Sequence, residues 1–186
     1  MRDNVMPQLT IWEIIIKTAM VHTFTYFAVG ACAFFLFDYS ARHASPVLSS
    51  FMRQSDDPLV RAGPLFQPLR GILFGFIFYL HRDVFFLRSN GWLVMWATLV
   101  VIGILSTFAP APGSIEGFIY TKLKPSKSGL VGMLEVLTQS LLLSVITYYW
   151  VNHPELAWLS WVFGILFAVA LILPAIGLLT HVHHEG

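Results

Sequence analysis

Hydrophobic residues form five long runs along the chain, and short polar or turn-forming segments separate them. A helix needs about 20 mostly apolar residues to cross the hydrocarbon core of a membrane. Runs of this length are too continuous for barrel strands, and only helices and closed barrels satisfy the backbone in lipid. The pattern therefore predicts an all-α integral membrane bundle with about five transmembrane helices, folded as a single domain over residues 1–186. The expected spans are 12–37, 66–86, 92–109, 130–151 and 156–179.

Two of the connections are short. Ser89-Asn90-Gly91 and Asn152-His153-Pro154 carry residues that favour tight turns. We therefore expect the second and third spans, and the fourth and fifth spans, to form antiparallel hairpins.

The two longer connections each predict a short helix at the membrane interface. In residues 38–65, Ser45 and Pro46 suit an N-cap and a first helical position, and apolar residues follow on one face. An irregular surface loop is the alternative there. In residues 110–128, a Pro-Ala-Pro-Gly segment must end the third helix, Ser114 suits a helix cap, and three lysines follow. A re-entrant loop is the alternative for this second connection.

Small residues mark the faces that are expected to pack. Gly71 and Gly75 form a GxxxG pattern, which permits the close approach of another helix. Pro174 is expected to kink the fifth span. Because a five-helix bundle of this size has little interior, we expect a homo-oligomer or a complex with another membrane protein. The Gly71–Gly75 face is expected to meet a close helix there, and packing inside the same chain is the alternative for this face. A small polar stripe on the fourth span consists of Ser140, Ser144 and Thr147.

The composition agrees with a membrane protein. Hydrophobic residues make up 56% of the chain and charged residues only 11%, whereas soluble domains carry roughly 25% charged residues. A soluble protein this apolar could not cover its own surface. The net charge of +1, without a basic cluster, excludes a nucleic-acid footprint. The expected surroundings are therefore the lipid bilayer.

Ionisable residues inside a span are costly, so each is a functional candidate. Glu135 lies about two turns into the fourth span, and Gln139 follows one turn later on the same face. Arg70, near the start of the second span, falls on the same side of the membrane. The structural interpretation is an ion pair between Glu135 and Arg70, with Glu116 as a competing partner. The functional interpretation is a carboxylate that handles protons or a substrate.

The first span carries three further polar side chains. Glu13 and Lys17 are four residues apart and suit a simple ion pair near the interface. His22 shares a helical face with Tyr26, and we expect that face to meet the interior of the bundle.

The second span ends in His81, Arg82 and Asp83, which an antiparallel arrangement places beside Glu13 and Lys17. An acid–base pair next to cations suits a membrane-surface enzyme that acts on a lipid-linked or phosphate-bearing substrate. In addition, histidines at positions 22 and 81, if they lie at similar depth, suit the ligation of a b-type haem. In the structural alternative, the histidine at 81 reaches the headgroups and the one at 22 bonds a neighbouring carbonyl.

No motif fixes a reaction, a catalytic residue or a cofactor. HExxH, GxSxG, a Walker loop and CxxC are all absent from the sequence. The histidines of the C-terminal tail have no fixed spacing to other ligands, so no metal site is predicted. The sequence is best interpreted as a membrane-embedded subunit, scaffold or small transport component. The surface enzyme, and a haem- or quinone-binding redox anchor that uses His22 and His81, are the alternatives.

Five spans would place the two termini on opposite sides of the membrane. All six tryptophans then fall on the N-terminal side, near one interface, where tryptophan is favoured. Lysines and arginines are more numerous on the other side, by seven to four. Because basic residues are enriched in cytoplasmic loops, we expect the N-terminus outside and the C-terminus in the cytoplasm.

Overall fold

The computed structural model describes residues 9–38, 49, 52–109, 111, 113–122 and 127–182, and these ranges contain only helices and connecting segments. Four segments are long and apolar enough to cross a membrane, so the chain is all-helical in its described part and has the character of a membrane protein. They are α1 (Ile11–Leu36), α4 (Gln67–Leu80) with the preceding 3-10 turn η1 (Gly63–Phe66), α8 (Lys127–Asn152) and α9 (Ala157–Val182). The interfacial helix predicted after Ser45 lies outside the described residues.

The third predicted span is shorter than expected. α6 (Gly91–Val100) has 10 residues and continues into a π-helical turn of 5 residues, η2 (Val101–Leu105). The apolar helix therefore ends at Leu105 rather than at residue 109. At 1.5 Å per residue it is about 22 Å long, against a hydrocarbon core of about 30 Å.

The second span also ends early. The apolar run continues to Phe86, but α4 ends at Leu80 and His81 leaves the helical path with φ −107° and ψ 19°. The next short helix, α5 (Arg82–Phe85), turns its aromatic end inward. Phe85 and Phe86 are buried, and the Phe85 ring meets Phe78 edge-on with 5.6 Å between centroids. These apolar residues close one end of the core instead of extending the span.

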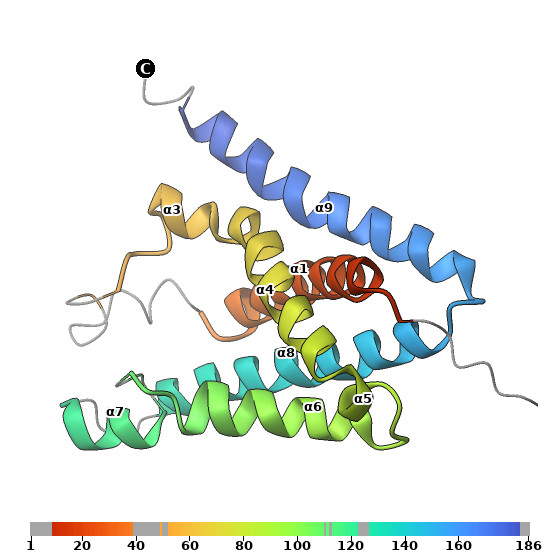
Figure 1. The fold of residues 1–186 in the computed structure, drawn as a ribbon. Coiled ribbons are helices and arrows are strands. Elements are labelled where there is room, and N and C mark those ends of the chain that lie inside the picture. Colours follow the sequence, from red (N-terminus) through yellow and green to blue (C-terminus); the bar gives the residue numbers. More distant parts are fainter. Residues whose placement is uncertain are drawn as a thin grey trace, which may run out of the picture.

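α1 is the central helix of the bundle. It packs against α4, α8 and α9, while α6 packs against α8 (Figure 1). The two predicted hairpins are wrong as statements about packing, because α1 rather than the preceding or following span is the main neighbour of both α4 and α9. α8 and α9 diverge from their connecting turn (Figure 1). A short turn sets the direction of the next helix but does not decide which faces meet.

Gly71 and Gly75 explain how α1 and α4 come so close. A Cβ atom on Gly71 would lie 2.6 Å from the Cα atom of Ala19, and one on Gly75 would lie 2.6 Å from the Cα atom of Ile15. Carbon atoms in ordinary contact are about 3.5–4.0 Å apart, so these positions admit no side chain. The close contact predicted from GxxxG is confirmed. This face serves packing inside the chain, which was the alternative to a contact with a partner, because α1 occupies it.

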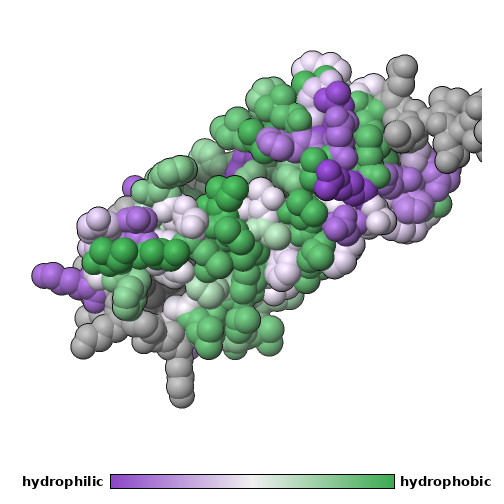
Figure 2. All heavy atoms as spheres, turned by 60° about the horizontal axis from the view of Figure 1, so that its bottom comes forward, coloured by the Kyte–Doolittle hydropathy of each residue, from purple (hydrophilic) through white to green (hydrophobic). Residues whose placement is uncertain are grey.

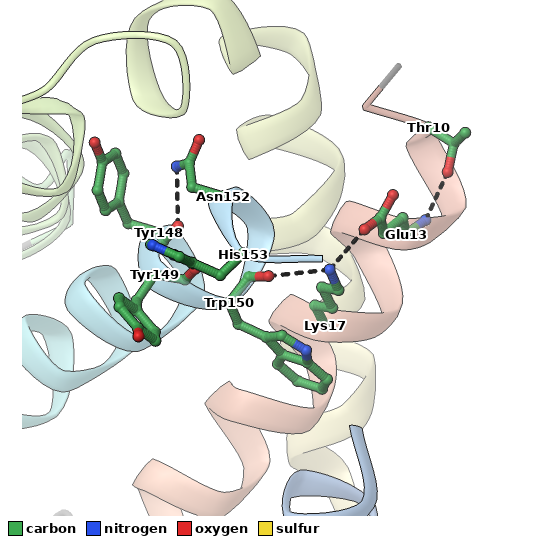
Figure 3. Close-up of polar contacts among 8 residues, drawn as sticks. All are labelled: Thr10, Glu13, Lys17, Tyr148, Tyr149, Trp150, Asn152 and His153. Carbon is green, nitrogen blue, oxygen red and sulfur yellow. Dashed lines mark hydrogen bonds and ion pairs between the residues drawn. The ribbon is translucent and has the colours of Figure 1, made fainter. Parts of the chain in front are cut away.

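The C-terminal turn of α8 is capped by its own polar side chains (Figure 3). The amide nitrogen of Asn152 donates to the carbonyl of Tyr148 over 2.9 Å, and Nδ1 of His153 donates to the carbonyl of Tyr149 over 2.8 Å. Helix ends leave carbonyl groups without partners inside the helix. The Asn-His pair that was predicted as a turn therefore also terminates the helix.

Lys17 ties α1 to this end of α8. Its ammonium group lies 2.6 Å from Oε1 of Glu13 and donates to the carbonyl of Trp150 over 3.1 Å (Figure 3). The predicted Glu13–Lys17 pair is thus confirmed. Lys17 is 9% exposed, and its charge is compensated by a carboxylate and by the negative end of a helix dipole.

Two short helices begin at side-chain caps. α7 (Ile115–Tyr120) starts after Ser114, whose Oγ accepts from the backbone N–H of Gly117 over 2.9 Å, so the predicted cap is confirmed. α3 (Pro58–Arg61) was not predicted. Asp57 caps it by accepting from the N–H of Leu59 over 2.8 Å.

The exterior is largely apolar. Figure 2 shows hydrophobic side chains over much of the middle of one face, with hydrophilic ones gathered toward its right-hand end. Along α9, residues such as Trp161 and Leu179 are mostly exposed, at 76% and 66%. α9 continues through Pro174 as one helix. An exposed apolar surface of this extent suits contact with lipid.

Candidate functional site

His22 lies in the middle of α1 and is 1% exposed. Its Nε2 is 3.1 Å from Oε1 of Gln67, and the amide nitrogen of Gln67 donates to the carbonyl of Gly63 over 3.1 Å. Because an amide oxygen can only accept, His22 donates from Nε2. A neutral ring then carries its lone pair on Nδ1, and Nδ1 has no hydrogen-bond partner within the described chain. The site thus holds a buried acceptor in a fixed orientation.

Aromatic rings surround His22. The ring of Phe74 meets it edge-on with 5.0 Å between centroids, and the ring of Tyr26 lies 6.5 Å away. The hydroxyl of Tyr26 reaches η1, where it would lie 3.4 Å from a Cβ atom on Gly63. The predicted inward face of α1 is therefore confirmed at His22, which is buried, and at Tyr26, which is half-buried.

Two opposite charges lie near Tyr26. Arg70 of α4 and Glu135 of α8 both act electrostatically on the tyrosine hydroxyl. Oε1 of Glu135 would lie 3.9 Å from a Cβ atom on Gly30. The guanidinium of Arg70 lies over the ring of Phe74, with Cζ 5.3 Å from its centroid. The predicted contact of Arg70 with Glu135 stays a prediction.

The other two predicted residues near this site are less engaged. Gln139 is half-buried on α8, one turn after Glu135. Glu116 is half-buried on α7, and in the described part of the chain it makes no ion pair with Arg70.

These groups form a polar line along one face of α1. Thr18, His22 and Tyr26 follow one another at intervals of four residues, which is about 6 Å of rise per step. The Glu13–Lys17 pair lies before the line, and Glu135 lies beside its far end. From Thr18 to Tyr26 the line covers about 12 Å, which is less than half of a hydrocarbon core of about 30 Å.

His81, Arg82 and Asp83 lie where α4 ends and α5 begins. His81 is exposed, and its Nδ1 donates to the carbonyl of Ile77 over 3.0 Å, which caps the end of α4. The guanidinium of Arg82 lies over the ring of Tyr79, with Cζ 4.6 Å from the centroid. Its Nε is 3.9 Å from Oδ1 of Asp83. Within the described ranges no ion pair joins these three residues to Glu13 or Lys17, and the acid–base site beside cations stays a prediction.

His22 and His81 lie at very different depths. The two glycine contacts set the register of α1 against α4 and place His22 level with about residue 68. His81 follows 13 positions later, which is roughly 20 Å along the axis. The expectation of similar depth is wrong because α4 ends at Leu80, so His81 stands at the end of the helix rather than inside it. The two histidines cannot ligate the same haem iron.

Among the described residues, no group of three or more histidine, cysteine, aspartate or glutamate side chains gathers to hold a metal ion. No protein-family model, curated protein or solved structure matches the chain. The fold and the site therefore define a class only: a helical protein with four helices able to cross a membrane and a buried polar site on its central helix.

Proposed function

We propose that the chain is a small transport component of a membrane and that it handles protons at His22. The observation that carries this proposal is the buried imidazole whose Nε2 is held by Gln67 while Nδ1 offers its lone pair. Histidine changes its charge near neutral pH and serves as a proton carrier for that reason. Ionisable residues in a membrane interior commonly mark such pathways.

The surroundings of His22 suit uptake and release of a proton. A proton accepted at Nδ1 gives an imidazolium whose Nε2–H is already donated to Gln67. The Glu13–Lys17 pair provides an ionisable entrance at one end of the polar line. Glu135 and Tyr26 provide titratable groups toward the other end. Ionisable groups therefore lie on both sides of His22 along α1.

Proton flux into liposomes tests this proposal. The purified protein is reconstituted with a trapped pH-sensitive dye, and a potassium diffusion potential drives the flux. We expect His22→Gln to slow the flux at least tenfold, because an amide hydrogen-bonds but does not carry a proton. His81→Gln is the matched control and should retain the wild-type rate, since His81 is exposed and outside the polar line.

Two results would overturn the proposal. One is wild-type liposomes that acidify no faster than protein-free ones. The other is equal flux for wild type and His22→Gln when both variants elute as folded protein with matching thermal stability.

We also propose five membrane crossings, with α6 and η2 as the short one and with the N-terminus outside. The ends of the helices that carry tryptophans lie at one end of the bundle: the starts of α1, α6 and α9 and the end of α8 (Figure 1). A helix about 8 Å shorter than the core is accommodated by local thinning of the bilayer or by tilting of its neighbours. The excess of basic residues on the opposite side supports a cytoplasmic location for that side.

Association with a second copy or with another membrane protein remains a proposal as well. It has to use a surface other than Gly71 and Gly75, because α1 fills that face. The particle mass in nanodiscs measures it directly, and a strict monomer without a co-purifying chain would contradict it.

A further inference from the structure

Three buried polar atoms lie close together in register and lack any hydrogen-bond partner within the described chain. They are Oγ1 of Thr18 and Nδ1 of His22 on α1, and Oγ1 of Thr147 on α8. The three residues are 0%, 1% and 0% exposed. Thr18 and His22 are four residues apart, so they stand one above the other on the same helical face.

Two contacts fix how α8 runs along α1. Near one end, the ammonium group of Lys17 reaches the carbonyl of Trp150. Near the other end, Gly30 lies beside Glu135. The two helices are therefore antiparallel, as Figure 1 shows.

Counting inward from these contacts places Thr18 at the level of residues 147–149 and His22 at the level of 143–145. Thr147 is thus level with Thr18, about one helical turn from His22. The register therefore groups Thr18 and Thr147 at one level of the α1–α8 contact. His22, whose ring also meets Phe74 of α4, follows one turn further along α1.

Other hydroxyls nearby do have partners. Thr23, also 0% exposed on α1, donates to the carbonyl of Ala19 over 2.8 Å, and Ser144 donates to the carbonyl of Ser140 over 2.8 Å. Buried polar groups are almost always hydrogen-bonded, and ordered water supplies the partner where the protein does not. Three exceptions in a single region are therefore unlike the rest of this interior.

We infer that Thr18, His22 and Thr147 form a buried water-binding site between α1 and α8. The chemistry of the three atoms suits water, because Nδ1 only accepts whereas each threonine hydroxyl donates and accepts. One water donates to Nδ1 and to one threonine oxygen and accepts from the other hydroxyl. This site stands independently of proton transport, although it would supply His22 with a proton donor.

Threonine-to-valine substitutions test the inference by the direction in which the melting temperature changes, because valine keeps the shape of threonine and removes its hydroxyl. If water joins the two threonines, Thr18→Val and Thr147→Val each lower the melting temperature more than the control Thr23→Val does. The melting temperature of the double variant then falls by less than the sum of the two single effects, since both substitutions remove the same water. If the region is dry, each substitution removes an unpaired polar group and raises the melting temperature, which would overturn the inference.

Solid-state NMR of the wild-type protein in bilayers tests the site even if the variants fold poorly. We expect magnetisation transfer from water to the side chains of Thr18, His22 and Thr147, and none to Thr23. Absence of transfer to all three would also overturn the inference. Water transfer without proton flux in liposomes would leave the water site standing and remove only the transport proposal.

Discussion

The contact between α1 and α4 gives the sharpest prediction about the fold. In Gly71→Ala, the new Cβ atom would lie 2.6 Å from the Cα atom of Ala19, so the two helices must separate by about 1 Å to restore carbon contact distances. Adding atoms to a well-packed interior lowers the free energy of unfolding by about 1–3 kcal/mol. Replacing glycine with alanine inside a helix raises it by about 0.5–1 kcal/mol. The difference of these two ranges is a net destabilisation of about 0–2.5 kcal/mol, with a middle value near 1 kcal/mol.

Gly75→Ala should behave in the same way, because its Cβ atom would meet the backbone of Ile15 at 2.6 Å. The two substitutions together should cost less than the sum of the singles, since one separation of the helices relieves both clashes. Gly177→Ala is the matched control: it adds a Cβ atom where nothing lies within 4 Å. This control should leave stability unchanged or raise it by about 0.4–1 kcal/mol.

Tryptophan fluorescence during unfolding in mixed micelles with increasing SDS measures these differences. The reasoning is refuted if Gly71→Ala and Gly177→Ala unfold at the same SDS fraction. It is also refuted if Gly71→Ala alters only the oligomeric state, because the contact would then lie between chains.

Three further predictions concern the ends of the bundle. Lys17→Met should destabilise the fold by about 1–3 kcal/mol, because it leaves the buried carbonyl of Trp150 and the half-buried carboxylate of Glu13 without their donor. Unchanged SDS unfolding would argue against this. A hydrogen bond from Arg53 lowers the pKa of Asp57. The Asp57 cap therefore contributes stability above the unfolded pKa of about 3.9, and this contribution is lost as the pH falls through the lower folded pKa. In NMR the Asp57 carboxyl signal should titrate below a pH of about 3.9 and Arg53→Ala should raise its midpoint, and an unchanged midpoint would contradict the prediction. In a cysteine-free background on intact cells, Asn90→Cys should react with an impermeant thiol reagent and Asp56→Cys should not, and the reverse pattern would invert the proposed orientation.

The sequence predicted the local features that depend on residue type. The cap at Ser114, the close-packing glycines and the burial of Ser140, Ser144 and Thr147 all follow from chemistry within a few residues. Hydropathy could not show where helices end inside an apolar run. At Phe85 the run is apolar because it fills the core, and not because it crosses lipid.

The partners of the candidate site were harder to predict. Gln67 forms a hydrogen bond with His22 across 45 positions of sequence. It stands at the edge of an apolar run, however, where a polar residue indicates only the end of a predicted span. Its spacing of four residues from Gly63 was a local signal for the second hydrogen bond. The pairing of Arg70 with Glu135 rested on a shared side of the membrane, and it stays a prediction. The packing of α1 against three helices depends on small residues at distant positions.

The tautomer of His22 tests the central claim most directly. Solid-state nitrogen-15 NMR of histidine-labelled protein in bilayers at neutral pH, assigned by comparison with His22→Gln, distinguishes the protonated ring nitrogen from the unprotonated one. The geometry at Gln67 predicts a proton on Nε2 and a lone pair on Nδ1. A His22 signal with the proton on Nδ1 would contradict the arrangement from which both the proton-handling proposal and the water site are derived.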